Sequence, residues 1–145
     1  MILIDRKVNF QVLDDLRYFK IKWIKAFGAK QTEKEIIDEI DVDGYLWEEF
    51  NCDRNDYLEG NDARKAFDQL KKRGYYVFYD NYRYDFPDLV EYENKAFEVL
   101  DWNKAKAKDF NKEDDIYIVD KYFRWTYVNT HEKGWCGPYF CKISK

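Results

Sequence analysis

The fold class of this chain is decided by the stretch Phe123-Arg124-Trp125-Thr126-Tyr127-Val128-Asn129, near its C-terminus. Aromatic and β-branched residues fill this stretch, which predicts a β-strand. Successive side chains of a strand point to opposite faces of its sheet. We therefore expect one face to carry Phe123, Trp125 and Tyr127, and the other face to carry Arg124, Thr126 and Val128.

Further strand signals lie on both sides of this stretch. Ile116–Val119 precedes it, and Asp120-Lys121-Tyr122 is short enough to link the two as a hairpin. Tyr139–Ile143 follows after a turn that contains two glycines and a proline. The aromatic run Tyr75–Tyr79 gives another strong strand signal. Together these runs predict an antiparallel meander.

Helical spacing dominates the N-terminal part. Apolar residues at three- and four-residue steps predict a first helix that ends near Gly28; they are Leu13, Leu16, Phe19, Trp23 and Phe27. The capping-box pattern Thr32–Glu35 predicts a second helix through Ile40. A third helix is expected from Asn61 or Asp62 to Gly74, with Lys71, Lys72 and Arg73 in its last turn. A fourth is expected over about 91–109.

The order of these elements predicts an α+β fold, with N-terminal helices packed on a C-terminal antiparallel sheet of about three to five strands. We expect residues 1–145 to form a single domain, because the length is typical of one and no linker or repeat interrupts the chain. Aromatic residues make up 20% of the sequence, so we expect a core built largely from rings.

The cysteine content predicts a reducing compartment. Three cysteines occur, Cys52, Cys136 and Cys141, which is an odd and low count for a disulfide scaffold. The apolar run at the N-terminus is too short for a signal peptide, and no later run is long enough to span a membrane. We therefore expect a cytoplasmic protein with no membrane partner.

Several C-terminal motifs resemble a family of short bacterial proteins, domain of unknown function 4275. The resemblance rests on Asp115–Val119, Trp125–Val128, Thr130-His131-Glu132 and Gly137–Phe140, with weaker matches at Leu46-Trp47 and from Gly60 to Phe67. It spans roughly residues 45–143 and implies a cytosolic bacterial protein. It implies no reaction, but some small bacterial proteins of this size are immunity or antitoxin partners.

The most unusual feature is an acidic segment, residues 31–62. It holds twelve acidic and two basic residues, a net charge of −10 in a chain whose total is −4. Such a surface attracts a basic partner and accelerates its association. We predict a protein-binding module rather than an enzyme, of the immunity or antitoxin kind, with a basic protein as partner. The expected contact residues are Asp43, Tyr45, Trp47, Glu48 and Glu49. The alternative is a solvated helix face.

A second hypothesis places a small enzyme or ligand-binding domain at the turn that follows the decisive strand. This turn carries the only histidine of the chain, and its candidate residues are His131, Glu132, Trp135, Cys136 and Tyr139. His131 could serve as base to a Cys136 or Cys141 thiolate, with Glu132 or an asparagine to orient it. The alternative is that both cysteines are buried apolar residues and that His131 bonds to the local backbone.

Other functions are expected to be absent. The Cys and His spacings are poor for zinc, and Asp41–Gly44 and Asp53–Asn55 lack the remaining ligands of a calcium loop. Arg73–Tyr79 resembles an RNA-recognition strand only superficially, and the total charge is negative. We therefore predict no metal, no cofactor and no nucleic-acid partner. A third hypothesis is a structural subunit of a larger assembly.

Overall fold

A computed structural model describes residues 1–28, 32, 34–35, 57–80 and 82–143. Its centre is a seven-stranded sheet with the order β1-β4-β3-β5-β6-β7-β2, in which every neighbouring pair is antiparallel. The strands are β1 Phe10–Leu13, β2 Tyr57–Glu59, β3 Tyr75–Tyr79, β4 Ala96–Val99, β5 Ile116–Asp120, β6 Trp125–Asn129 and β7 Tyr139–Lys142.

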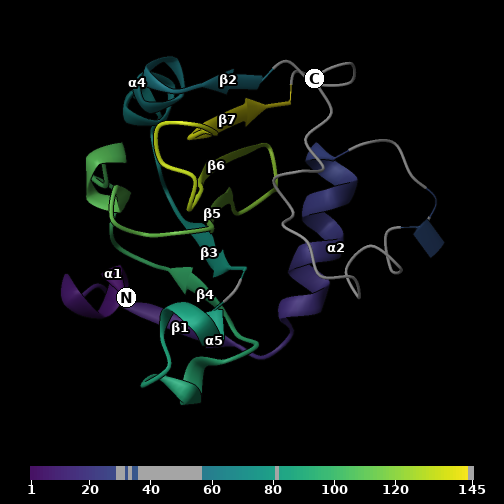
Figure 1. Cartoon of the computed structure of the whole chain (residues 1–145), viewed down its shortest axis with the longest axis vertical. Coiled ribbons are helices and arrows are strands. Elements are labelled where there is room, and N and C mark those ends of the chain that lie inside the picture. Colours follow the sequence, from purple (N-terminus) through teal and green to yellow (C-terminus); the bar gives the residue numbers. More distant parts are fainter. Residues whose placement is uncertain (29–31, 33, 36–56, 81, 144–145) are drawn as a thin grey trace.

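Helices cover both faces of this sheet (Figure 1). The longest described helix, α2, is the only described helix on one face, and α1, α4, α5 and two 3₁₀ turns lie on the other. The helical elements are α1 Ile2–Asp5, α2 Leu16–Phe27, α4 Asn61–Gln69, α5 Tyr82–Asp85, η2 Val90–Tyr92 and η3 Ala107–Phe110. The fold is therefore three-layered, and its central strands are buried on both sides.

The core beneath α2 is held by aromatic packing and one buried hydrogen bond. The Trp23 indole meets the Tyr117 ring edge-on, with 5.3 Å between centroids. Its Nε1–H donates to Thr126 Oγ1 at 3.0 Å, and the Thr126 hydroxyl donates to the carbonyl of Ile118 at 3.0 Å. This chain of bonds lets a threonine sit in a fully buried strand without an unsatisfied polar group.

The core on the opposite face is centred on Phe67 of α4, which is fully buried. Its ring stacks on Tyr127 with 4.5 Å between centroids and meets the edges of Phe110 and Trp125, each at 5.9 Å. Aromatic pairs in these geometries add to the stabilisation that burial already gives. One side chain thus joins α4 to β6 and η3.

The α+β class is confirmed, but the expected division into N-terminal helices and C-terminal strands is wrong. The sheet has seven strands among the described residues, not three to five, and β1 precedes α2 in the chain. The three unexpected strands, β1, β2 and β4, have three or four residues each. Runs this short carry little periodicity, and sheet pairing rather than local propensity defines them.

The helix expected over 91–109 is wrong. The structure has η2, then β4, then η3 in that range. Ala96, Phe97 and Leu100 lie at helical spacing in the sequence, yet β4 pairs with β1 on one edge and β3 on the other. Two ladders of backbone hydrogen bonds outweigh the weak preference of such residues for a helix.

Two finer expectations are also corrected. Phe123 was expected on the face of Trp125 and Tyr127, but its φ of +56° places it outside β6, and its ring packs on the α2 face against Phe19 and Tyr76. The third helix ends at Gln69, so Lys71–Arg73 lie in the following loop instead of the last helical turn. Of the second helix, only the capping contact is described: the Glu35 N–H donates to Thr32 Oγ1 at 3.3 Å.

We predict that Phe67→Ala lowers the free energy of unfolding by about 3–5 kcal/mol, because it opens a cavity between α4 and the sheet. Equilibrium urea denaturation followed by tryptophan fluorescence measures this loss. The control is Tyr84→Ala, which removes a ring that is 82% exposed and should change stability by less than about 0.5 kcal/mol. Equal effects of the two substitutions would contradict the assigned core.

Candidate functional site

The turn between β6 and β7, residues 130–138, contains the site predicted from the lone histidine. It is braced from within, because the N–H groups of Trp135 and Cys136 both donate to the Glu132 carbonyl at 3.0 Å. The Lys133 ammonium also ties the turn to the preceding loop: it donates to the Thr130 carbonyl within the turn and to the Glu113 carbonyl outside it, both at 2.8 Å, and pairs with Asp114 at 2.9 Å. The turn therefore presents its side chains from a fixed backbone.

His131 is oriented by Asp115. Its Nδ1 lies 3.0 Å from both carboxylate oxygens of Asp115, and its backbone N–H donates to Asp115 Oδ1 at 3.2 Å. Asp115 is only 1% exposed, whereas the His131 side chain is 36% exposed. The hydrogen bond to Asp115 raises the pKa of His131, although partial burial opposes this shift.

Sequence reasoning missed Asp115 as the partner of His131 and suggested Glu132 or an asparagine instead. Glu132 Oε1 is 3.9 Å from His131 Nε2, farther than Asp115 is from Nδ1. The two partners are sixteen residues apart, so no local motif joins them. The register of the hairpin brings them together, because Ile116 pairs with Asn129 and the residues just beyond these strand ends become neighbours.

Cys136 does not have the environment of an activated thiolate. Its thiol is hydrogen-bonded to Glu132 and Tyr139, and the bond to Glu132 is the main cause of a raised pKa. A negative carboxylate beside a thiol disfavours the thiolate, which is the nucleophilic form. The other described cysteine, Cys141, is fully buried in β7 on the α2 face. The structure thus brings His131, Glu132 and Cys136 into one turn without activating the sulfur.

Acidic groups surround the base of this turn. Burial raises the pKa of Asp85 to about 6, and the nearby Asp114, Asp115 and Glu113 add to this shift. Asp85 Oδ2 is buried and has no hydrogen-bond partner among the described residues, which fits a carboxyl that is partly protonated near neutral pH. Within the described ranges, however, no group of three or more His, Cys, Asp or Glu residues is arranged to hold a metal ion.

Of the remaining candidate site residues, two are described by the structure and the others are not. Trp135 is 88% exposed at the tip of the turn, and Tyr139 is buried at the start of β7. The five expected partner contacts all lie outside the described residues: Asp43, Tyr45, Trp47, Glu48 and Glu49. The two calcium-like loops and Cys52 lie outside them as well.

The structure adds a feature that sequence reasoning did not single out: a basic cleft of about 860 Å³ at the other end of the β5–β6 hairpin. Loop residues after α4, the β5–β6 turn and the end of β7 line it. The sequence signal was present in the run Lys71-Lys72-Arg73, which was attributed to a helix end. No local pattern links that run to Arg124 or Lys142.

The family model described as a domain of unknown function, DUF4275, matches residues 3–140. The chain belongs to this family. The match confirms the resemblance seen in the C-terminal motifs and extends it to the N-terminal helices. No curated protein and no solved structure matches the chain. No helix among the described residues is long and apolar enough to cross a membrane.

We predict that His131 titrates above the usual histidine pKa of about 6.5 and that Asp115→Asn moves its pKa back toward that value. Asparagine tolerates the positive φ of +49° at this position, so the fold should persist. Because the pKa of His131 is raised in the folded state, the His131–Asp115 pair stabilises the fold fully below about pH 6.5. This stabilisation is lost as pH rises through the folded-state pKa. The imidazole NMR signal, the only one in the chain, reports the titration.

Glu132→Gln is the control for this titration, since Glu132 is a weaker contributor to the shift. It should move the His131 pKa much less than Asp115→Asn does. A His131 pKa that is indifferent to Asp115→Asn would show that the ion pair does not govern this residue.

We predict that the Cys136 thiol alkylates slowly at neutral pH, at a rate that His131→Ala does not change. Glu132→Gln should accelerate labelling, because it removes the carboxylate that raises the thiol pKa. Mass spectrometry on a Cys52→Ser background isolates this signal, since Cys141 is buried. Fast labelling of wild type that His131→Ala slows would restore the Cys–His pair as a catalytic hypothesis.

Proposed function

We propose that this protein is a non-catalytic protein-binding module, of the immunity or antitoxin kind, that holds a basic partner protein with its acidic segment. The observation that carries the proposal is the charge of residues 31–62, which is −10, against +6 for the rest of the chain. A charge of this density steers an oppositely charged protein to the surface and repels phosphate backbones.

Aromatic residues within the segment supply the second component of an interface. Tyr45 and Trp47 stand between Asp43 on one side and Glu48 and Glu49 on the other. Binding energy concentrates on Trp, Tyr and Arg anchors, while surrounding charges set the rate and the specificity. The proposed contact set remains these five residues.

Described residues that precede and follow the proposed contact set in the sequence are packed into the fold. On the N-terminal side, α2 packs on the sheet down to its last residue, Phe27, which is fully buried. On the C-terminal side, Tyr57 pairs with Cys141, and Glu59 accepts a hydrogen bond from the Gly137 N–H at 3.1 Å. In the sequence, the proposed contact set therefore lies between two packed elements, α2 and β2.

The described acidic residues of the segment are available to solvent. Glu35, Glu59 and Asp62 are all exposed. Charges on an exposed surface act over about a Debye length, roughly 8 Å at physiological ionic strength. They add to the field that a basic partner would meet.

A second candidate function is an acid–base or ligand-binding site at the 130–138 turn. The observation that favours it is the contact between His131 and the buried Asp115, because a carboxylate that orients a histidine is a common arrangement in general acid–base catalysis. The raised pKa of Cys136 weighs against a thiol nucleophile in that site.

We predict that the protein, used as bait in lysate of its native host at low salt, captures one basic protein, and that Glu48→Lys with Glu49→Lys abolishes this capture. The control is Asp88→Lys with Glu91→Lys, which makes the same charge change at two exposed positions outside the segment. Capture should survive in the control, and salt should release the partner, because exposed charges are screened.

Two results would contradict the proposal. A partner that both double variants lose equally would reflect net charge rather than the segment. A partner retained at high salt and by both variants would bind elsewhere, and the 130–138 turn would then be the surface to examine.

A further inference from the structure

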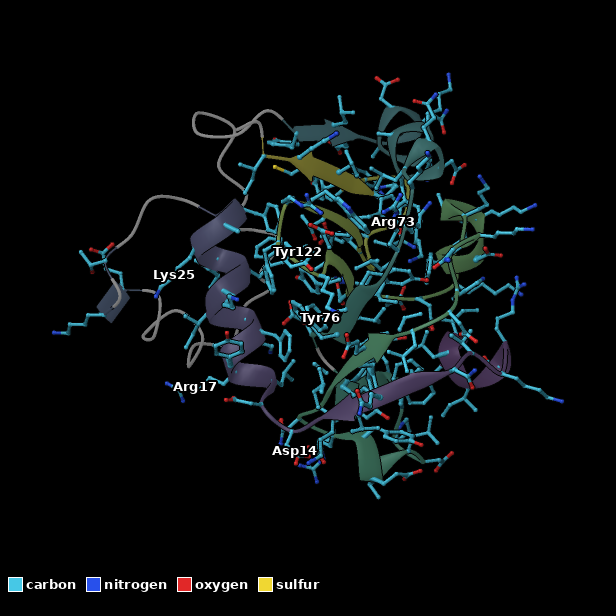
Figure 2. The ribbon with its side chains drawn as sticks, turned by 180° about the vertical axis from the view of Figure 1, so that it is seen from behind. Asp14, Arg17, Lys25, Arg73, Tyr76 and Tyr122 are labelled. Atoms are coloured by element: carbon cyan, nitrogen blue, oxygen red, sulfur yellow. The ribbon has the colours of Figure 1, made fainter. Side chains whose placement is uncertain are left out.

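The basic cleft lies where three segments that are distant in sequence converge. The loop after α4 contributes Leu70, Lys71, Arg73 and Gly74, the β5–β6 turn contributes residues 120–125, and β7 ends the wall with Lys142 and Ile143. The Ile143 N–H donates to the Arg124 carbonyl at 2.9 Å, which fixes the end of β7 to the turn. Figure 2 shows Arg73 and Tyr122 on the same side of the molecule.

The cleft is strongly positive in an otherwise acidic protein. Its lining holds five basic residues and one acidic residue, a net charge of +4, whereas the whole chain carries −4. The acidic residue, Asp120, is already engaged, because both the backbone N–H and the Nε–H of Arg124 donate to its Oδ2 at 3.0 Å.

Three of the basic residues have no acidic partner among the described residues. Within the described ranges, Lys71, Arg73 and Lys142 take part in no ion pair, and Lys121 lies 3.7 Å from Glu98. Uncompensated cations that line a cleft focus the field and favour an anionic ligand. The cleft therefore selects for negative charge.

The same cleft presents a planar aromatic surface. The Tyr122 side chain is 71% exposed, and the Arg124 guanidinium lies 5.1 Å from its ring centroid. Phe123 and Trp125 also line the cleft, but both are largely buried and their rings pack on opposite faces of the sheet, so Tyr122 supplies the exposed ring. An exposed ring with a guanidinium next to it is a platform on which a nucleobase stacks.

We propose that this cleft binds a nucleoside phosphate, with the phosphate among Lys71, Arg73 and Lys142 and the base stacked on Tyr122. The proposal is independent of the acidic segment and adds a second ligand to the binding function proposed above. The negative total charge predicts no nucleic-acid partner. The electrostatic field inside the cleft, however, is set by the residues that line it.

Other anions fit the cleft less well. Inorganic phosphate would use the cations and leave the exposed Tyr122 ring without a role. An acidic peptide binds most often along a sheet edge or in an extended groove, whereas this cleft is formed at strand ends and has the size of a small-molecule site. A nucleoside phosphate combines negative charge with a flat apolar ring, as the lining does.

We predict that isothermal titration calorimetry at low salt detects ATP binding to the full chain, and that Lys71→Gln, Arg73→Gln and Lys142→Gln together weaken it at least tenfold. Tyr122→Ser should weaken ATP binding about fivefold or more and leave the weaker binding of inorganic phosphate unchanged. The parallel probes are AMP, a ten-nucleotide single-stranded RNA and a polyglutamate peptide. All substituted side chains are exposed, so the variants should fold.

Matched controls change the same residue types elsewhere on the surface. Lys104→Gln, Lys108→Gln and Lys112→Gln remove three exposed charges near η3, and Tyr84→Ser removes an exposed ring; neither should alter ATP binding by more than twofold. Tighter binding of ATP than of RNA would identify a free nucleotide as ligand, and the reverse order would identify a nucleotide unit of a strand.

Three results would overturn the proposal: no nucleotide binding at millimolar concentration, ATP binding that the triple variant retains, or binding of polyglutamate in the absence of nucleotide binding. Glu48→Lys with Glu49→Lys should leave ATP binding within twofold. The experiments therefore distinguish failure of the nucleotide proposal for the cleft from failure of the protein-binding proposal for the acidic segment.

Discussion

The burial of β5 and β6 on both faces is the constraint on which the rest of the structure depends. Every residue of these two strands is buried. In a sheet with one wet face, alternate residues would be polar and solvated. Here the polar side chains of the hairpin depend on partners within the protein: Thr126 bonds to the Ile118 carbonyl, and the Asn129 amide donates to the Phe110 and Glu113 carbonyls at 2.7 and 3.2 Å. The exception is the Tyr127 hydroxyl, which is buried with no hydrogen-bond partner among the described residues.

The same constraint explains why tyrosine is so common in the core. A tyrosine ring fills apolar space, and its hydroxyl reaches a polar group at the boundary. The Tyr117 hydroxyl donates to Asp80 at 2.6 Å, and the Tyr79 hydroxyl donates to Glu113 at 2.9 Å. Tyr75 likewise donates to the Trp102 carbonyl at 2.8 Å. The hydroxyls therefore tie the interior of the sheet to the loops around it.

Because the hairpin interior is closed to water, its chemistry is confined to its two ends. Asp115 and His131 flank one end, where β5 begins and β6 finishes. Asp120 and Arg124 flank the other end, where the basic cleft opens. Both acidic residues are buried and face a basic group that is more exposed. The two candidate sites therefore lie at opposite ends of the same buried hairpin.

The part of this arrangement that the sequence could predict is the part set by local pattern. Tyr75–Tyr79 was found because five consecutive β-forming residues leave little choice, and the helix over Leu16–Phe27 because its apolar residues recur at helical spacing. The contact of His131 with Asp115 depends on the exact register of the β5–β6 hairpin. The pairing of β4 with β1 and β3, and the convergence of Lys71, Arg124 and Lys142 on one cleft, depend on strand order. Strand order is a property of the assembled sheet, and no local pattern encodes it.

The total charge of the chain is a poor guide to its partners for the same reason. The value of −4 is the sum of −10 in residues 31–62 and +6 elsewhere, and the cleft alone carries +4. At physiological salt a ligand responds mainly to charges within roughly 8 Å, so the residues that line the cleft, rather than the total charge, set the field inside it. Salt weakens binding at either surface, so ionic strength alone does not tell them apart, and substitution of individual charged residues does.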